Sequence, residues 1–304
     1  MSTTPDVSII LVGRNSSKHL ASCLDSLSSV EWGEFTGEVI YVDNASVDGS
    51  TELVRARCPD AKIISNSSNV GFCGACNQAI RASRARYVYL LNNDTLLLPN
   101  SIRPLVEFID ANPRAGAAGN RLLNPDGTDQ WSARRFPSWR NALVGRRTPF
   151  SRYFARSSAL RDYLYKEQMA GTEPFAVDWV PGSCTLVRRE ACERIGLLPE
   201  DLHYWSDAVF CIRLKRAGWT IHIVPTSPLV HFEGEGTGRK TAAVRRWLIS
   251  DFHRGAYHFY CEQNGFGSAH PARWLVKGAL SIRAGLLIFA DRVAHVETAN
   301  NGGT

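Results

Sequence analysis

The chain has 304 residues, of which 44% are hydrophobic and 21% charged, and its 35 Lys and Arg exceed its 29 Asp and Glu by 6. This composition predicts a largely folded chain, either one large α/β domain with appendages or two small domains, and it excludes a low-complexity or solenoid protein. The modest positive charge suits phosphorylated substrates, an anionic membrane surface or nucleic acid, so charge alone does not choose among them.

The amino terminus and the cysteines indicate a cytoplasmic protein. The opening residues, MSTTPDVSIILVGRN, place no basic segment before a long apolar run and so predict no secretory signal peptide. Eight scattered cysteines indicate reduced, buried thiols rather than a disulfide framework. Cys73 and Cys76 form a CxxC pair, but no second pair or suitably spaced His accompanies them, so packing is favoured over a redox or zinc role.

The first 112 residues alternate strands with helices. We expect strands at 7–12, 38–44, 61–65 and 86–92, and helices at 16–27, 48–57, 74–83 and 99–112. Such alternation predicts parallel strands joined by crossover helices, with ligands bound beyond the carboxyl ends of the strands. Polar residues follow three of these strands and should converge on one crevice: Gly13, Arg14 and Asn15; Asp43 and Asn44; and Asn92, Asn93 and Asp94.

The rest of the chain divides into three parts. Residues 124–175 are rich in Arg and aromatic residues and are interpreted as a partly flexible insertion. Regular structure resumes at 177–189, followed by a helix near 207–217 and a strand at 219–225 that returns the chain to the sheet. From Arg245 the pattern is helical, above all at 272–294, where Lys277, Arg283 and Arg292 interrupt the apolar residues too often for a membrane span. This helix is either an interfacial amphipathic helix or a helix packed on the catalytic domain or in a homodimer.

Carboxylates at two strand ends carry the candidate chemistry. Asp94 after two asparagines could hold a divalent cation against a diphosphate, although an Asn/Asp turn that caps the next helix is the alternative. Asp43 could accept hydrogen bonds from a nucleobase or a ribose, while Ser46 and Asp48 cap the following helix. The loop at 66–80, with Asn69 and Gly71, allows close approach of a ligand but contains neither a dinucleotide nor a P-loop motif.

Two later residues complete the candidate site. Ser206 is expected to cap a helix and to leave Asp207 in the first turn, where the helix dipole favours the ionised form that a general base needs. A plain first-turn residue is the alternative. His231 precedes a Gly-rich loop ending in Arg239 and Lys240, which would suit a departing diphosphate, although a lone His is more often simply packed.

Taken in order, the motifs between Val7 and Gly238 resemble the family 2 glycosyltransferases, especially the bacterial rhamnosyltransferase-like branch. The resemblance is carried by VSIILVGRN, EVIYVDNASVDGS, NSSNVGFCGACNQAI, RYVYLLNNDTLLLP, AAGNRLLNPDGT, VDWVPGSCTLVRREACERIG, YWSDAVFCIRLKRAGW and LVHFEGEGTG.

The resemblance implies a GT-A type fold with a mostly parallel, Rossmann-like sheet, a nucleotide-diphosphate-sugar donor, a divalent Mg or Mn ion, and an inverting displacement. Asp207 falls at the position of the catalytic base, and Asp94 and His231 fall at the metal. The donor would contact Gly13, Arg14, Asn15, Asp43, Asn69, Gly71, Asn92, Asn93 and Arg239, and the acceptor Gly182, Ser183 and Trp205.

Three positions depart from the family pattern. Ser206 and Val209 stand where acidic residues are common, and Asn92 replaces the first acidic residue of the metal element. These departures motivate an alternative, a catalytically degenerate donor-binding protein that recruits or regulates a partner transferase. A nucleic-acid binder is disfavoured, because the basic residues accompany no recognised nucleic-acid-binding fold.

The expected organisation is a catalytic domain at 1–240 followed by a helical region at 241–304 that contacts a membrane or a second copy. Within the catalytic domain, 1–120 would bind the nucleotide-sugar, 121–176 form the basic and aromatic insertion, and 177–240 bind the acceptor and carry out catalysis. The expected activity is transfer of a sugar, with dTDP-rhamnose the first donor to try, to a lipid-linked or polysaccharide acceptor at the cytoplasmic membrane face.

Overall fold

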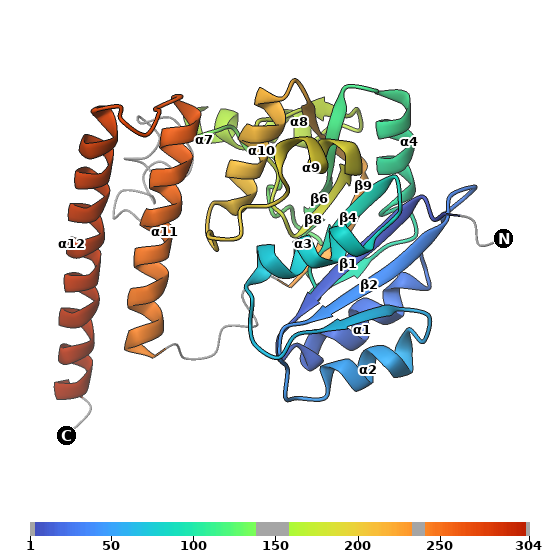
Figure 1. Cartoon of the computed structure of the whole chain (residues 1–304), viewed down its shortest axis with the longest axis horizontal. Coiled ribbons are helices and arrows are strands. Elements are labelled where there is room, and N and C mark those ends of the chain that lie inside the picture. Colours follow the sequence, from blue (N-terminus) through green and yellow to red (C-terminus); the bar gives the residue numbers. More distant parts are fainter. Residues whose placement is uncertain (1–3, 138–157, 233–240, 302–304) are drawn as a thin grey trace.

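The computed structural model describes residues 4–137, 158–232 and 241–301. The amino-terminal part consists of β1 (Val7–Gly13), α1 (Ser17–Leu27), β2 (Gly37–Asp43), α2 (Ser50–Arg57), β3 (Lys62–Ser65), α3 (Phe72–Ala82), β4 (Tyr87–Leu91), β5 (Thr95–Leu97), α4 (Arg103–Ala111) and β6 (Ala115–Leu123). It is followed by α7 (Ser158–Tyr163), α8 (Lys166–Met169), β7 (Phe175–Ala176), β8 (Cys184–Arg188), α9 (Arg189–Ile195), α10 (Ser206–Arg216), β9 (Thr220–His231), α11 (Ala242–Gln263) and α12 (Ala272–Asn301) (Figure 1).

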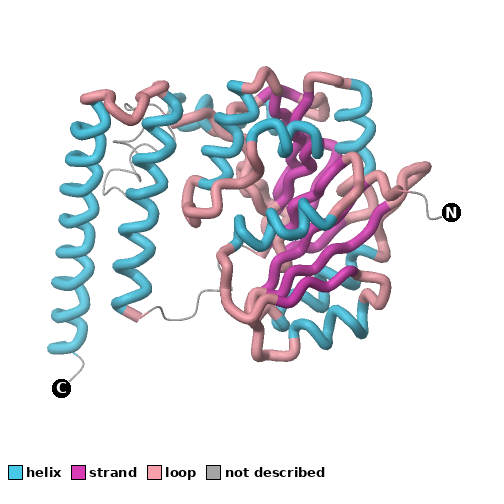
Figure 2. The backbone as a smooth tube through the Cα atoms, in the orientation of Figure 1, coloured by secondary structure: helices cyan, strands magenta, loops and turns pink. Residues whose placement is uncertain are grey.

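One sheet organises the described residues, with the strand order β3-β2-β1-β4-β8-β6-β9-β5 and β7 paired to β9. The strands β3, β2, β1 and β4 are parallel, as the sequence predicts. Beyond them β8 runs antiparallel to both β4 and β6, so the whole sheet is mixed. Helices cover both faces of the sheet, which is the arrangement of an α/β fold (Figure 2).

The core lies in two layers because alternate residues of each strand point to opposite faces. On β1, Ile10 packs in the layer beneath α3 and α10, whereas Ile9 and Leu11 pack in the layer beneath α1 and α4. The eight cysteines are free, and all except the half-buried Cys58 are buried. Burial raises the pKa of Cys73 to about 11, which agrees with a packing role for this thiol.

Two predicted helix boundaries are wrong. The second helix begins at Ser50 rather than near Asp48, and the fourth begins at Arg103 rather than at Pro99, because residues 99–102 form a turn between β5 and α4. Ser46 does not cap α2, since its hydroxyl accepts the backbone N–H of Asn15 at 3.0 Å. Asp48 accepts from the N–H groups of Ser50 and Ser17, and although burial opposes the effect, these hydrogen bonds lower the pKa of Asp48 to about 2.

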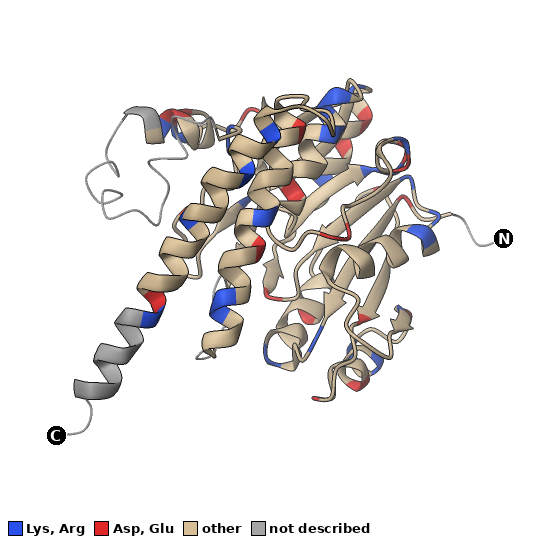
Figure 3. Ribbon diagram, turned by 60° about the vertical axis from the view of Figure 1, so that its left-hand side comes forward, with Lys and Arg blue, Asp and Glu red and all other residues tan. Residues whose placement is uncertain are grey.

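The two long carboxyl-terminal helices form an antiparallel pair beside the sheet, with α12 outermost (Figure 1). α11 is joined to α10 by the ion pair between Arg213 and Glu262 at 2.7 Å, and α12 is joined to α11 by Arg245 and Asp291 at 2.9 Å. Figure 3 shows Lys and Arg distributed along both helices. Of the helices described, none combines the length and the apolar character needed to cross a bilayer.

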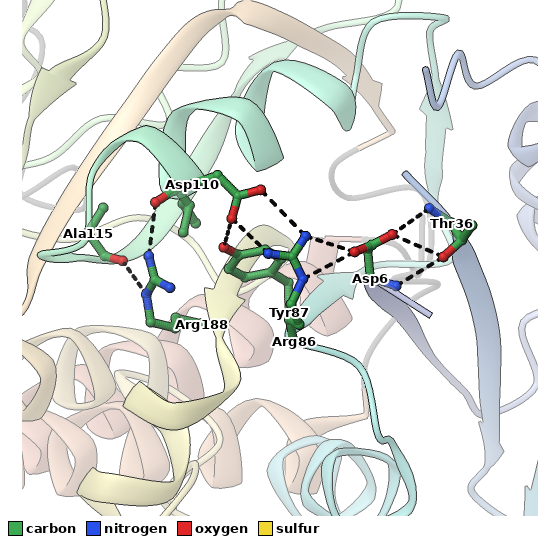
Figure 4. Close-up of polar contacts among 8 residues, drawn as sticks. Asp6, Thr36, Arg86, Tyr87, Asp110, Ala115 and Arg188 are labelled. Carbon is green, nitrogen blue, oxygen red and sulfur yellow. Dashed lines mark hydrogen bonds and ion pairs between the residues drawn. The ribbon is translucent and has the colours of Figure 1, made fainter. Parts of the chain in front are cut away.

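A polar network lies at the edge of the sheet where β1 and β4 begin and the antiparallel β8 ends, opposite the candidate site (Figure 4). Arg86 lies 2.7 Å from Asp6 and 2.9 Å from Asp110, and the hydroxyl of Tyr87 donates to Asp110. Arg188 donates to the carbonyl of Ala115 at 3.2 Å. These contacts join β1, β4, β8 and α4, so we assign this network to the stability of the fold.

Candidate active site

The polar strand ends meet at the carboxyl edge of the sheet. Gly13 pairs with Asp43 in the β1–β2 register, and the N–H of Asn44 donates to the carbonyl of Gly13 at 2.8 Å. The side-chain amide of Asn93 donates to the carbonyl of Val12 at 2.9 Å. The three polar segments therefore adjoin, as expected from parallel strands.

Asp43 has the features of a ligand-binding carboxylate. The residue is only 6% exposed, and its Oδ2 accepts the N–H of Ser46 at 3.1 Å. Its Oδ1 is buried and has no hydrogen-bond partner among the described residues. Since buried polar atoms are nearly always hydrogen-bonded, this oxygen is suited to a donor from a bound ligand, such as a nucleobase N–H or a ribose hydroxyl.

The flanking loops are shaped by side-chain amides. Asn15 adopts a φ of 51°, and its Oδ1 accepts the N–H of Val47 at 2.9 Å. Asn44, one of the polar residues expected at the crevice, donates to the carbonyl of Gly71 at 3.1 Å and accepts from Asn66 at 3.1 Å. Asn69 and Gly71 thus lie in a loop tied to the end of β2, with the Oδ1 of Asn69 accepting the N–H of Gly71 at 3.0 Å. Arg14 is exposed at the same edge.

Asp94 and His231 come together through pairing of β5 with β9. Thr95 pairs with His231 in this register, and the N–H of Phe232 donates to the carbonyl of Asp94 at 2.9 Å. The Nε2 atom of His231 lies 3.4 Å from Oδ1 of Asp94. That Oδ1 is buried and has no hydrogen-bond partner within the described parts of the chain.

This pair fits a divalent cation held together with a ligand. No cluster of three or more metal-binding side chains occurs among residues 4–137, 158–232 and 241–301, so the protein would supply two ligands there. Diphosphate oxygens and water complete such sites in many nucleotide-binding enzymes. Two ligands bound side by side with bonds of about 2.1 Å lie roughly 3 Å apart, close to the separation of Asp94 and His231.

Asp207 lies in the first turn of α10, as predicted, but its environment differs from the prediction. Ser206 does not cap the helix: Trp205 occupies the cap position with a φ of 69°, and the Ser206 hydroxyl donates instead to the carbonyl of His203 at 3.3 Å. Burial raises the pKa of Asp207 and outweighs the hydrogen bond from the N–H of Ala208 and the charge of Arg134. The helix dipole was expected to favour the ionised form, and in the structure burial has the larger influence on the pKa of this group.

The pKa of Asp207 is raised because apolar side chains line one side of its carboxylate. A cavity of about 10 Å³ is lined by Asp207 together with Leu90, Val180, Leu198 and Phe210. Removing a carboxylate from water disfavours its charged form. A general base is more effective when its pKa lies nearer to the working pH, so this apolar lining favours proton abstraction by Asp207.

The loop before β8 lies between Asp207 and the segment that contains Asp94. A Cβ atom at Gly182 would lie 3.6 Å from the Cβ of Asp207, and the carbonyl of Ser183 accepts the N–H of Asn92 at 2.8 Å. Gly182 and Ser183 thus lie between α10 and the Asn92–Asp94 segment. The position fits an acceptor bound between base and donor.

Some predicted site residues have other contacts or cannot be placed. Trp205 packs against Phe252 and Phe259 of α11, with ring centroids 5.4 and 5.0 Å away. Arg239 lies outside the described residues, as do 138–157 within the predicted insertion. The described ends of that insertion are folded: Arg134 bridges to Trp179 and stacks its guanidinium 4.8 Å above that ring.

Arg134 and Gln130 were missed by the sequence reasoning. Arg134 contributes positive charge near Asp207, and Gln130 contacts His231. Both lie in the segment interpreted as a partly flexible insertion. The only available signal was the regular turn sequence NPDGT at 124–128, which predicts a return of the chain towards β6.

Comparisons with known structures agree with this architecture. The fold is similar to a mannosyltransferase from Pyrobaculum calidifontis in complex with GDP-Man and Mn²⁺, at 18% identity and a TM-score of 0.58 over 98% of this chain and 81% of that one. It is also similar to residues 1–349 of TarS from S. aureus, at 14% identity and a TM-score of 0.55 over 92% of this chain and 80% of that one. The protein thus has the GT-A fold of glycosyltransferases.

The sequence identifies the family. Residues 8–196 match the family described as glycosyl transferase family 2, and the chain belongs to that family. It is 29% identical, over 92% of both chains, to the N-acetylglucosaminyl-diphospho-decaprenol L-rhamnosyltransferase of Mycobacterium tuberculosis. The chain is therefore a glycosyltransferase, and its resemblance to rhamnosyltransferases is confirmed.

Proposed function

We propose that this glycosyltransferase moves L-rhamnose from dTDP-rhamnose, with inversion, to a hydroxyl of a lipid-linked glycan acceptor in cell-surface glycan synthesis. The observation that carries the proposal is the arrangement of Asp207 on one side of Gly182 and Ser183 and of Asp94 with His231 on the other. The mycobacterial relative, whose name specifies rhamnose and a diphospho-decaprenol acceptor, supports the choice of sugar and acceptor.

Asp207 would act as the general base. Its carboxylate takes the proton of the acceptor hydroxyl while that oxygen forms a bond to the anomeric carbon of the donor. The bond between this carbon and the diphosphate oxygen breaks in the same step, and its electron pair leaves with the diphosphate. Attack from the face opposite the leaving group inverts the anomeric configuration.

The donor side would be held by the strand ends. The free Oδ1 of Asp43 would accept a hydrogen bond from the nucleoside, with Asn92, Asn93 and the loop of Asn69 and Gly71 beside it. Asp94 and His231 would hold a divalent Mg or Mn ion. Such an ion, when bound, neutralises charge on the departing diphosphate.

A catalytically degenerate, regulatory protein is the second candidate. Its support was the loss of acidic residues at Ser206 and Val209. In this structure Val209 is fully buried in the core and Ser206 is also buried, so both side chains pack rather than face a ligand. This observation favours the enzyme.

The outer face of α12 would place the enzyme on an anionic phospholipid surface. We define this face by five apolar residues that are at least 66% exposed: Trp274, Leu275, Ile282, Leu286 and Phe289. Lys277 and Arg292 are exposed on the same helix, and Asp291 is paired with Arg245. Over residues 272–292 of this helix, where the structure describes the side chains, Asp291 is the single acid. Exposed apolar and basic residues of this kind complement an anionic bilayer, where a lipid-linked acceptor would be found.

Membrane docking is tested by sedimentation with vesicles of phosphatidylglycerol or phosphatidylcholine. We expect binding to the anionic vesicles, lost in a double variant with Ile282→Glu and Leu286→Glu and retained in the exposed control Ser281→Glu. Equal binding of all proteins would refute this use of α12. A dimer in solution that the double variant dissociates would instead assign the face to a homodimer.

Calorimetric titration with dTDP-rhamnose and with UDP- and GDP-sugars, with and without Mn²⁺, tests the donor. We expect Mn²⁺-dependent binding of the dTDP sugar and its loss in Asp94→Asn. Transfer to a synthetic GlcNAc-diphospho-lipid, followed by NMR of the new linkage, tests the acceptor and inversion. Binding of another donor would replace rhamnose, whereas donor binding without any transfer by the wild type would favour the degenerate protein.

A further inference from the structure

Gln130 contacts His231 through both ends of its side-chain amide. Its Nε2 donates to the backbone carbonyl of His231 at 2.6 Å, and its Oε1 lies 2.9 Å from the Nδ1 of the His231 ring. The carbonyl oxygen can only accept a hydrogen bond, so the amide nitrogen must face it and the amide oxygen must face the ring. The ring nitrogen Nδ1 therefore carries a hydrogen and donates it to Oε1.

This hydrogen bond determines what His231 presents to Asp94. In a neutral imidazole with the hydrogen on Nδ1, Nε2 carries a lone pair. The Nε2 atom lies 3.4 Å from Oδ1 of Asp94, a buried oxygen with no hydrogen-bond partner among the described residues. A cation bound between two such electron-rich atoms would stabilise this arrangement. In metal sites, a His that binds the metal through one ring nitrogen commonly donates the N–H of its other ring nitrogen to a fixed acceptor, as Nδ1 does here to Gln130.

Gln130 is itself fixed by a short hairpin that follows β6. The N–H of Gln130 donates to the carbonyl of Leu122 at 2.9 Å. Its neighbour Asp129 forms a two-pronged ion pair with Arg121, at 2.7 and 3.1 Å. The turn between the two arms includes Gly127 with a φ of 82°, a conformation that favours glycine. The amide is therefore held in place before any ligand arrives.

We propose that Gln130 is a positioning residue: it holds His231 in the Nδ1–H tautomer so that Nε2, together with Asp94, is presented to the divalent ion of the donor complex. This inference rests on the metal site of the proposed function and adds a residue to it. Gln130 would not touch the donor or the reacting atoms, and it would act through His231 alone.

Two substitutions separate this role from a purely structural one. Gln130→Leu removes both hydrogen bonds. Gln130→Glu keeps an acceptor for the Nδ1 hydrogen but loses the donor to the His231 carbonyl. If Gln130 matters only as an anchor of the hairpin to β9, both variants should fail alike, whereas the positioning role predicts that Gln130→Glu retains function.

The first measurement is the tautomer of His231, read from ¹⁵N-histidine NMR spectra at a pH where the ring is neutral and assigned by loss of the signal in His231→Asn. We expect the Nδ1–H form in the wild type and in Gln130→Glu, and a shift towards Nε2–H in Gln130→Leu. An Nε2–H ring in the wild type would overturn the inference, whether or not metal binds.

The second measurement is the affinity for Mn²⁺ in the presence of saturating dTDP, followed by electron paramagnetic resonance. Loss of an outer partner of a metal-binding His typically costs about 10- to 100-fold in affinity, and we expect a loss of this size in Gln130→Leu. Gln130→Glu should bind Mn²⁺ at least as well as the wild type. The control Asn124→Ala, which breaks only a 2.8 Å bond to Thr128 in the same hairpin, should bind unchanged.

The outcomes distinguish the inference from the proposed function. Wild-type protein that binds no Mn²⁺ with dTDP would refute the metal site on which both depend. Wild-type binding that Gln130→Leu leaves unchanged would refute the role of Gln130 alone. Equal loss in Gln130→Leu and Gln130→Glu would assign Gln130 to the stability of the hairpin.

Discussion

Gly255 of α11 lies against the turn that leads into α10, the helix that carries the proposed base Asp207, so substituting it should disturb Asp207 from a distance. A Cβ atom at this position would clash with the carbonyl of Tyr204 and lie 3.0 Å from Cδ1 of Trp205. The turn has little freedom to move, because the N–H of Tyr204 is held by the buried Asp251 at 3.0 Å. Gly255→Ala should therefore displace the start of α10.

The magnitude follows from two opposing effects. Replacing glycine by alanine inside a helix stabilises it by about 1 kcal/mol, whereas forcing a methyl group into a packed contact costs roughly 1–3 kcal/mol. Gly278→Ala on α12 is the matched control, since its new Cβ would have no atom within 4 Å. The free energies of unfolding of the two variants should differ by about 1–3 kcal/mol. Each kcal/mol corresponds to about 2–4 °C in Tm for a chain of about 150–250 residues, somewhat shorter than this one.

Thermal unfolding and steady-state transfer assays measure both consequences. Because misplacing a catalytic group by about 1 Å can cost on the order of 100-fold in rate, Gly255→Ala should lower kcat by at least about 10-fold while leaving the donor KM nearly unchanged. Gly278→Ala should raise Tm slightly and leave kcat unchanged. If Gly255→Ala gained stability like the control and kept its kcat, the contact between α11 and the catalytic turn would not constrain Asp207.

Three further predictions concern two titratable residues, Asp207 and His222. Asp207→Asn should lower kcat by about 10²- to 10⁴-fold with donor affinity retained, and a variant with normal turnover would exclude Asp207 as the base. The same variant should be more stable than the wild type at pH 7. Burial raises the pKa of Asp207, so above that pKa the folded wild type carries an unfavourably buried charge. The difference in Tm should vanish below pH 3.8, the pKa of this carboxyl in the unfolded chain. Burial also lowers the pKa of His222 from 6.5, so this residue contributes stability above pH 6.5 that is lost as the pH falls through its folded value. His222→Phe keeps a ring against Phe108. Its urea unfolding midpoint should fall less than that of the wild type between pH 7.5 and 5. If both proteins lose stability equally over this range, burial does not depress the pKa of His222.

The sequence by itself determined the class of fold and the edge of the sheet at which its polar residues gather. Strands and helices alternate with different hydrophobic periods, and parallel strands place their carboxyl ends at one edge. Polar residues that interrupt apolar runs at Asp43 and at Asn92–Asp94 were therefore assigned to one crevice, where the structure places them. Local patterns of this kind are readable because they depend on neighbours along the chain.

Only the tertiary structure decided the contacts that tune the site. His231 reaches Asp94 because β5 and β9 pair, and Gln130 reaches His231 from a hairpin 101 residues away in the sequence. Asp207 has a raised pKa because apolar residues from several distant segments line one side of its carboxylate and limit its contact with water, which outweighs the local effect of the helix terminus. The pairing of distant strands and the burial of a polar group by distant segments leave no local pattern in a sequence. The capping of α10, the environment of its carboxylate and the orientation of His231 could therefore be established only from the folded chain.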